Sequence, residues 1–162
     1  MLNTPRILLR ELTLADAESL YRLNADPEVI RYTGDAAFAD VEAAKEFLKS
    51  YDHYEKYGFG RWAVIRKEDG EFLGWCGIKY TPEVDEYDVG FRFFKKCWGG
   101  GYATEAAKVS LDYGLNELRI KTLVGRTMKA NTASVRVLEK LGMTYWKSMD
   151  FHGGEWVVYK TP

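Results

Sequence analysis

Short, largely apolar runs that contain β-branched and aromatic residues recur in the first half of the chain, which is typical of strands. This pattern predicts strands over residues 7–12, 61–66 and 72–80. The turn Asp69-Gly70 lies between the last two segments, and Asp-Gly between two apolar runs is a strong hairpin signal. These two segments are therefore expected to pair as antiparallel strands.

Between the first and second of these strands, the pattern changes to that of a helix. Thr13 and Asp16 have the spacing of a capping box and open a first predicted helix, which ends at the Asp26-Pro27 step. A second helix is predicted over residues 40–57, because apolar residues recur every three or four positions and Gly58 follows. The front half of the chain is thus expected to combine strands with two helices.

The second half of the chain also alternates between strands and helices. Residues 87–94 alternate strictly and predict a long strand, and residues 122–127 predict another. Asn131 is a good helix N-cap and Gly142 a good residue to follow a helix, so a helix is predicted between them. Residues 144–159 predict a closing hairpin. This order of elements is that of an α/β fold with an antiparallel front half.

Length and composition indicate one soluble domain. The 162 residues are 46% hydrophobic and 15% aromatic, which is enough for an ordinary core, so residues 1–162 are expected to form a single domain. The net charge of −1 disfavours a nucleic-acid partner. We expect neither a leader nor a membrane span, and Cys76 and Cys97 have no neighbours at metal-ligand spacing. The sequence therefore predicts a cytoplasmic protein without a metal.

Three consecutive glycines, Gly99 to Gly101, stand between the 87–94 strand and an alanine-rich helical segment. Glycine lets backbone N–H groups turn toward an anion, and the N-terminus of the following helix adds unpaired donors, so phosphates could be held there. Tyr102 and Ala103 stand where an ATP or GTP loop needs Lys and Ser or Thr, and Thr104 stands where a dinucleotide loop needs Gly or Ala. The spacing alone leaves open that the glycines only form a turn.

The helix that Asn131 caps carries one hydroxyl on its inward face. Ser134, Val137, Leu138 and Leu141 recur at helical spacing and form this face. Ser134 lies at the N-terminal end of the helix, so its side chain is expected to point inward near the mouth of the fold.

Together these motifs resemble those of a known family. The segment Lys96-x-x-Gly99-x-Gly101-Tyr102-Ala103-Thr104-Glu105-Ala106, followed by Asn131-x-x-Ser134 and Lys140-Leu141-Gly142-Met143, resembles the acetyl-CoA-binding core of the GNAT N-acetyltransferases. The most similar branch contains the ribosomal-protein N-terminal acetyltransferases. The resemblance implies a mixed, mostly antiparallel sheet of about seven strands flanked by about four helices. It also implies that the 87–94 and 122–127 strands splay apart, with the pantetheine arm of the cofactor in the gap.

The resemblance further implies a set of cofactor-binding residues. Backbone groups of the 87–94 strand would pair with pantetheine, and the glycine loop would hold the pyrophosphate. The implied residues are Phe91, Phe93, Lys96, Trp98, Gly99, Gly100, Gly101, Tyr102, Ala103, Asn131 and Ser134. Lys96 keeps a cation where the family usually has Gln or Arg. Asn131 is either a cofactor contact or only an N-cap.

Transfer of an acetyl group to an amine calls for an acid that protonates the thiolate and a base that takes the ammonium proton. Many family members have a tyrosine acid where this chain has Leu138, and Ser134, one helical turn away, is the natural replacement. The family often carries an acidic residue two positions before the glycine at Gly90, which makes Asp88 the first candidate base and Glu86 the second. The alternative for Asp88 is a solvated strand residue.

The region around the second predicted helix indicates where an acceptor would bind. Aromatic residues gather there, and Asp26, Glu28 and Asp35 flank them. These acids would suit a cationic amine, or they are simply exposed loop charge. His53 and His152 are expected at the surface.

Two hypotheses of function follow. The first is an enzyme that transfers an acetyl group from acetyl-CoA to a primary amine, either a protein N-terminus or a small molecule, by direct attack in a ternary complex. The second is a CoA-binding module that has lost catalysis and senses a ligand. The fold would support either, and the chain is also a candidate for a homodimer.

Overall fold

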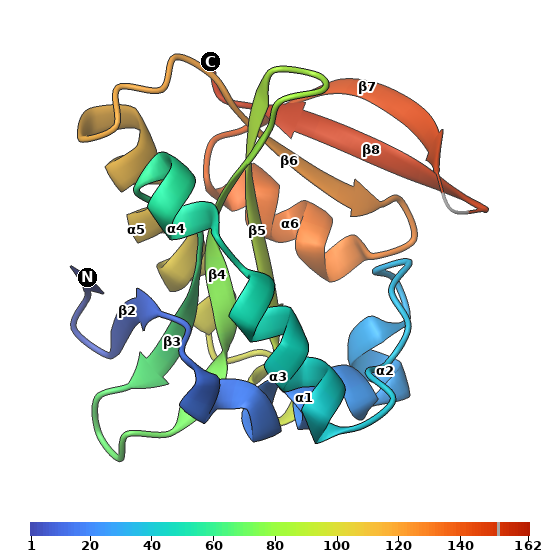
Figure 1. Cartoon of the computed structure of the whole chain (residues 1–162). Helices are drawn as coiled ribbons and strands as arrows, with labels where there is room; N and C mark the ends of the chain where they lie inside the picture. Colours follow the sequence, from blue (N-terminus) through green and yellow to red (C-terminus); the bar gives the residue numbers. More distant parts are fainter. Residues whose placement is uncertain (152) are drawn as a thin grey trace.

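A computed structural model describes residues 1–151 and 153–162, so the expectation for His152 lies outside the described residues. One sheet runs through the molecule with the strand order β1-β2-β3-β4-β5-β6-β8-β7 (Figure 1). Its strands are β1 (Leu2–Asn3), β2 (Ile7–Glu11), β3 (Arg61–Arg66), β4 (Phe72–Thr81), β5 (Glu86–Phe93), β6 (Leu123–Met128), β7 (Thr144–Phe151) and β8 (Gly154–Lys160). Neighbouring strands are antiparallel, except that β5 and β6 are parallel.

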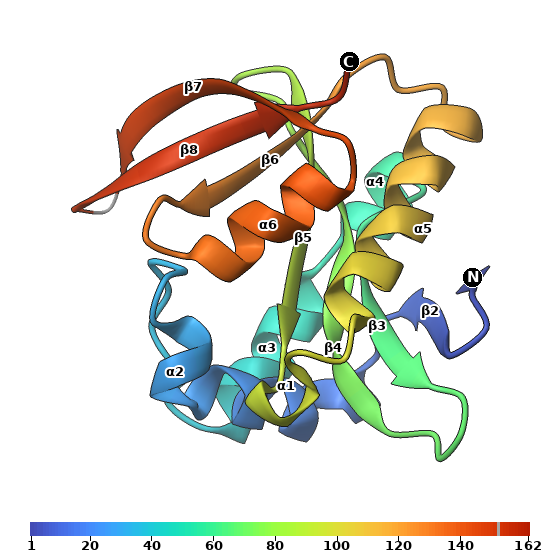
Figure 2. The same ribbon diagram turned by 180° about the vertical axis from the view of Figure 1, so that it is seen from behind.

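Helices cover both faces of this sheet. They are α1 (Ala17–Ala25), α2 (Pro27–Ile30), α3 (Val41–Ser50), α4 (His53–Tyr57), α5 (Tyr102–Asn116) and α6 (Thr132–Lys140). On one face, α1 and α3 pack together in a small apolar cluster that includes Trp75 of β4. On the other face lie α5 and α6 (Figure 2), and α5 buries Ala106, Ala107 and Leu111 in the main core.

Most of the elements predicted from the sequence are present near their expected positions. The α/β class and the mixed, mostly antiparallel sheet are confirmed, with eight strands rather than about seven because β1 pairs with β2 at the edge. The sequence did not predict the short helix α2, which starts with Pro27. The Asp26 side chain caps it by accepting a hydrogen bond from the Glu28 N–H at 2.9 Å.

The single helix predicted over residues 40–57 is wrong, because the chain forms two helices there. Tyr51 ends α3 with an extended backbone, at ψ 100°, and its hydroxyl accepts a hydrogen bond from the Arg61 N–H at 2.8 Å. The neighbouring Tyr54 hydroxyl donates to the Arg61 carbonyl. These bonds fix the break between α3 and α4 through a distant strand, which a local helical period cannot reveal.

The expected splay between β5 and β6 is confirmed. The two strands pair only at Tyr87 with Leu123 and at Asp88 with Val124, and they diverge beyond these residues. On the β4 side, the Phe94 N–H donates a hydrogen bond to the Leu73 carbonyl at 3.0 Å. Hydrogen-bonded and non-hydrogen-bonded positions alternate along an antiparallel pair, so Phe93, Phe91 and Val89 occupy positions that are not hydrogen-bonded to β4. The N–H and C=O groups of Val89 and Phe91 therefore point away from β4 and into the gap.

Cys76 and Cys97 are free and buried. In the described part of the chain, no helix combines the length and the apolar composition needed to cross a bilayer.

Candidate active site

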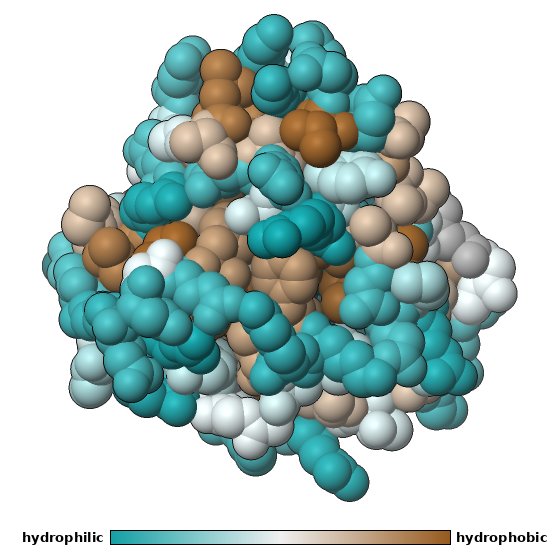
Figure 3. All heavy atoms as spheres, turned by 90° about the horizontal axis from the view of Figure 1, so that it is seen from below, coloured by the Kyte–Doolittle hydropathy of each residue, from teal (hydrophilic) through white to brown (hydrophobic). Residues whose placement is uncertain are grey.

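A cavity of about 650 Å³ lies where the β5–β6 gap opens toward α1 and α3. Its lining includes Arg61 and Trp75 from the sheet, the β5 residues 88–92, and Asn131 and Ser134 of the α6 region. Tyr51 and the segment between α2 and α3 close it from the other side. Figure 3 views the molecule from this end and shows a hollow with apolar side chains inside and hydrophilic ones around it. The cavity thus joins the helical layer of one face to the start of α6 on the other.

The glycine loop lies beyond the C-terminal end of β5, as the sequence predicts. Gly99 and Gly101 have φ angles of 80° and 82°, in the left-handed region that favours glycine, and Gly101 is the N-cap of α5. The N–H groups from Gly99 to Thr104 donate to no acceptor among the residues that the structure describes. A row of unpaired amides at a helix N-terminus fits a pyrophosphate.

The structure brings most of the predicted cofactor residues together in this loop, but it turns Lys96 elsewhere. The Lys96 ammonium is paired with Glu71 of the β3–β4 hairpin. The Trp98 side chain is half exposed, and its indole N–H donates to the Phe93 carbonyl at 3.0 Å. Tyr102, the first residue of α5, stacks under the Arg6 guanidinium at 4.3 Å from the ring centre. Backbone amides, and not the lysine charge, therefore dominate this loop.

The two predicted β5 contacts differ in their surroundings. The Phe93 side chain is buried in the core, and its carbonyl is occupied by Trp98. Phe91 lines the cavity, and its backbone groups face the gap where β6 has diverged. Of the two predicted contacts, Phe91 is thus the one whose backbone is free to pair with an extended ligand arm.

At the start of α6, Asn131 has a defined capping role that leaves Ser134 free. The Asn131 Oδ1 accepts a hydrogen bond from the Ser134 N–H at 3.3 Å, which confirms Asn131 as the N-cap. The Ser134 hydroxyl has no hydrogen-bond partner among the described residues, and it lines the cavity beside Leu138. Gly142 follows the helix with φ 83°, as expected of the residue after a helix end.

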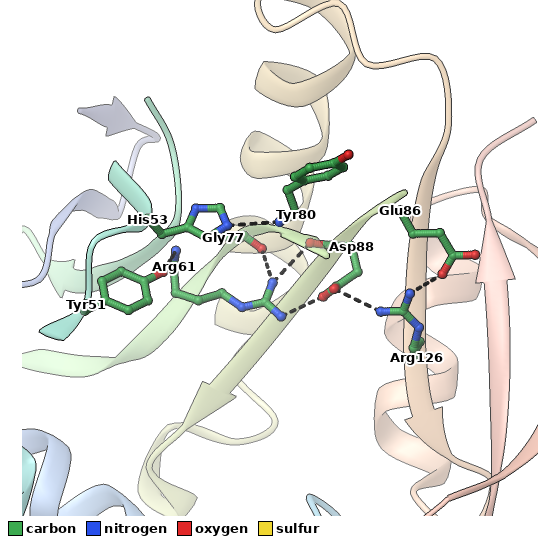
Figure 4. Close-up of polar contacts among 8 residues, drawn as sticks. All are labelled: Tyr51, His53, Arg61, Gly77, Tyr80, Glu86, Asp88 and Arg126. Atoms are coloured by element: carbon green, nitrogen blue, oxygen red, sulfur yellow. Dashed lines mark hydrogen bonds and ion pairs between the residues drawn. The ribbon is translucent and has the colours of Figure 1, made fainter. Parts of the chain in front are cut away.

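A chain of ion pairs crosses the floor of the cavity (Figure 4). Asp88 accepts from Arg61 Nη2 at 2.6 Å with one oxygen and from Arg126 Nη1 at 3.0 Å with the other. Arg126 also pairs with Glu86. Arg61 packs so closely over Gly90 that a Cβ there would lie 2.7 Å from its Nη2. Three strands are thus tied together by charge below the splay.

Asp88 is 6% exposed, so it is not the solvated strand residue of the alternative interpretation. Burial alone would raise the pKa of its carboxyl, but the charges of Arg61 and Arg126 and the Arg61 hydrogen bond outweigh burial and lower the pKa. Asp88 lines the cavity, whereas Glu86 lies outside the lining and reaches it only through Arg126. Both stay candidate bases, and Asp88 has the better position.

His53, expected at the surface, is half-buried. Its Nδ1 lies 2.7 Å from the Phe59 carbonyl oxygen, and its Nε2 accepts a hydrogen bond from the Tyr80 N–H at 3.0 Å (Figure 4). Both ring nitrogens are therefore engaged with backbone groups. The ring joins α4 to β4 and leaves no nitrogen free for proton transfer.

Sequence reasoning missed Arg61 and Arg126, the two partners of Asp88. Arg126 belongs to a strand that also carries Leu123, Val124 and Met128, and a charge inside such a strand is a signal that a partner is needed. Arg61 carries no such signal, because it begins its strand. Of the acidic residues expected near the acceptor, Asp35 lines the cavity, while Asp26 caps α2 and Glu28 pairs with Lys95.

The splayed strands, the amide-lined loop and the cavity between them define the class of protein as an acetyltransferase of the GNAT type. A family model described as "Acetyltransferase (GNAT) domain" matches residues 6–144, and the chain belongs to this family. Within the described residues, no three His, Cys, Asp or Glu side chains are grouped so that they could hold a metal ion.

Two relatives are similar to most of this chain. The chain is 38% identical to the uncharacterized protein YkkB of Bacillus subtilis strain 168, over 91% of this chain and 87% of the relative. It is 31% identical to the FsC-acetyl coenzyme A-N(2)-transacetylase of Aspergillus fumigatus, over 89% of this chain and 65% of that protein.

Solved structures show the same fold. A GNAT-family acetyltransferase from Bacillus anthracis superposes with a TM-score of 0.81 and 28% identity, covering 98% of this chain and 95% of the other. A ribosomal-protein-S5-alanine acetyltransferase from Vibrio fischeri has a TM-score of 0.81 over 99% of this chain and 94% of the other, but its identity of 16% supports the fold alone. The ribosomal-protein branch therefore stays a prediction.

Proposed function

We propose that this protein transfers the acetyl group of acetyl-CoA to a primary amine by direct attack in a ternary complex. The observation that carries the proposal is the β5–β6 gap, because its free backbone groups at Phe91 face a cavity that also contains Ser134 and Asp88. Ser134 and an ionised Asp88 in one cavity favour the enzyme over the alternative, a binding module without catalysis.

The residues of the chain fit an extended acyl-CoA. The N–H groups from Gly99 to Thr104 would hold the pyrophosphate, and the backbone of Phe91 would pair with the pantetheine arm. Bound acetyl-CoA supplies an activated acetyl thioester. The name of the Aspergillus fumigatus relative includes acetyl coenzyme A, which supports the same co-substrate here.

The transfer moves one acetyl group and one proton. The amine nitrogen attacks the thioester carbonyl, the carbon–sulfur bond breaks, and an N–H that faces the gap at Val89 or Phe91 stabilises the negative oxygen. The Ser134 hydroxyl donates a hydrogen bond to the departing sulfur. Before the attack, Asp88 or a water that it orients takes one proton from the bound ammonium, which gives the nitrogen its lone pair. Because the pKa of Asp88 is lowered, the proton then passes on to bulk water. Glu86 is the second candidate for this step.

Replacing Ser134 with alanine is expected to lower kcat by about ten- to a hundredfold, with little change in the KM for acetyl-CoA. The reason is that the hydroxyl acts on the thiolate, which is formed only during the transfer. The melting temperature should stay close to that of the wild type, because the cap of α6 comes from the Asn131 side chain.

The matched variant is Asn131→Ala, which removes the cap and should cost about 1 kcal/mol of stability. Kinetics and thermal melts on both variants separate the two roles. A Ser134→Ala protein with full activity would remove Ser134 from the mechanism.

The ternary-complex step is tested by the mass of the protein. After incubation with acetyl-CoA alone, the intact protein should keep its mass, and addition of an amine should then release the thiol. A stable acetyl adduct on the protein before the amine is added would contradict direct attack and indicate a covalent intermediate.

The acceptor is proposed only as a class, a protein N-terminus or a small-molecule amine. The ribosomal-protein branch would favour a protein N-terminus, and the name of the Aspergillus fumigatus relative describes an N(2)-transacetylase. A cytoplasmic location and a homodimer also stay predictions of the sequence.

A further inference from the structure

The acceptor cavity is richer in cations than in acids, although the sequence indicated acids around it. Its lining contains four cationic side chains, Arg61, Lys79, Arg92 and Arg126, and two carboxylates, Asp35 and Asp88. Counting Glu86, which pairs with Arg126 from outside the lining, still leaves one positive charge in excess. A cavity with this balance attracts an anion and disfavours a ligand with only positive charge.

Two of the four cations are fully committed to the protein. Arg61 donates to the Asp88 carboxylate and to the carbonyls of Gly77 and Asp88, and Arg126 spans Asp88 and Glu86. The excess charge therefore resides on Arg92 and Lys79.

Arg92 is held in place by buried groups. Its side chain is 11% exposed, its Nη1 donates to the Asn24 Oδ1 at 2.9 Å, and its guanidinium lies 5.2 Å from the centre of the Trp75 ring. Asn24 is itself buried and carries no charge. Asn24 thus holds the Arg92 guanidinium in place without neutralising it, so its positive charge can still attract an anion from the cavity.

On the cavity side, Arg92 has a partner that solvent reaches easily. Its Nη2 donates to Asp35 Oδ2 at 2.7 Å, and the Asp35 side chain is 58% exposed in the segment between α2 and α3. An ion pair with so exposed a member contributes little to stability, so it can be exchanged at small cost. Lys79 lines the same cavity, is exposed, and has no hydrogen-bond or ion-pair partner among the described residues.

We propose that the acceptor amine also carries a carboxylate, which replaces Asp35 on Arg92 and is attracted by Lys79. This inference rests on the proposed acetyl transfer and adds the class of substrate. The Asp35–Arg92 bond already has the geometry of a carboxylate on a guanidinium, and Arg92 needs no rearrangement to accept another. The acceptor is thus an amino acid, an amino acid derivative or a short peptide, and not a simple monoamine or polyamine.

The first test compares acceptors of similar shape with and without a carboxylate, with each KM expressed in terms of the concentration of free amine. The pairs are leucine with leucinamide, glycylglycine with glycylglycinamide, and γ-aminobutyrate with n-butylamine, and putrescine represents the polyamines. In the pair that is acetylated best, the carboxylate member should have a KM lower by about tenfold or more, since a charge-assisted bond is lost in the other. Equal or better use of the neutral members or of putrescine would overturn the proposal.

Two variants test whether Arg92 and Asp35 carry this preference. Arg92→Gln should raise the KM of the carboxylate acceptor by about ten- to a hundredfold and leave that of its neutral partner nearly unchanged. Asp35→Asn should lower the KM of the carboxylate acceptor by about two- to fivefold, because it removes the internal competitor. A merely structural role of the pair would not give this gain. A higher KM in Asp35→Asn would contradict the exchange.

The matched control is Lys108→Gln, which removes a positive charge from an exposed pair on α5, outside the cavity lining. It should change neither the KM nor the preference. Binding of the carboxylate acceptors without acetyl-CoA, followed by NMR, separates this inference from the proposed function. Binding that Arg92→Gln abolishes, without acetylation of any amine, would refute the enzyme and retain the anion site. Absence of both would refute both.

Discussion

Replacing Gly101 with valine is expected to weaken the binding of coenzyme A by about a hundredfold or more. Gly101 has φ 82° at the N-cap of α5, where a β-branched residue is strongly disfavoured, so the loop must change its backbone. The change turns amides away from the phosphates, and the loss of two charge-assisted hydrogen bonds of about 1.5 kcal/mol each accounts for the effect. Isothermal titration calorimetry measures it directly.

The control for this variant is Gly142→Val, at the end of α6. Gly142 has φ 83° and a Cβ there would meet no atom within 4 Å, so the backbone strain is comparable, but the residue lies outside the glycine loop. It should lose stability and keep its affinity for coenzyme A. Lys96→Ala should weaken binding by less than about tenfold, because this exposed lysine is already paired with Glu71. An unchanged affinity in Gly101→Val would remove the phosphate site from the glycine loop.

Replacing Asp88 with asparagine is expected to lower kcat/KM by about a hundredfold at pH 7. The loss should be larger at lower pH. The pKa of Asp88 is lowered, so its carboxylate is ionised across the neutral range and the wild type can use a bound ammonium there. The variant can use only the fraction of the acceptor that has already lost its proton in water. Its kcat/KM should therefore rise tenfold per pH unit up to the pKa of the acceptor. A pH–rate profile on both proteins measures this difference.

The same substitution is expected to destabilise the protein by about 3 kcal/mol or more, since it leaves Arg61 and Arg126 without their buried counter-charge. Because the pKa of Asp88 is lowered on folding, its contribution to stability is complete above the unfolded pKa of about 3.9 and is lost as the pH falls through the folded value. Acid denaturation should thus show a smaller loss in the variant.

Asp112→Asn is the matched control, because Asp112 forms an exposed pair with Lys108 on α5. Its stability should stay within about 0.5 kcal/mol of the wild type. If Asp88→Asn changed stability but left the shape of the pH–rate profile unaltered, the proton would pass to Glu86 or to bulk water, and Asp88 would only hold the two arginines.

Features encoded by neighbouring residues could be predicted from the sequence. The glycines of the loop, the Asn131 cap and Gly142 each meet a local backbone requirement, so their positions follow from a few adjacent residues. The alternation of residues 87–94 likewise predicted β5, because a strand exposes its two faces in turn.

The partners of the charged residues could not be predicted, because they come together only in the folded sheet. Arg61, Asp88 and Arg126 belong to three strands, and no spacing along the chain relates them. The pairing of Lys96 with Glu71 similarly depends on how the β3–β4 hairpin lies against the loop. The same limit applies to the acids expected to suit a cationic acceptor. Their cationic partners cannot be seen in the sequence, and Asp35 is paired with Arg92 in the structure.

The most direct test of the central claim is the amine-dependent release of coenzyme A. The purified protein is incubated with acetyl-CoA and a panel of amino acids, peptides and simple amines, and the free thiol and the mass of each acceptor are measured. The account predicts that at least one acceptor gains a single acetyl group and that one thiol is released for each acetyl group transferred. Tight binding of coenzyme A without amine-dependent thiol release for any acceptor would contradict it and identify the protein as a binding module.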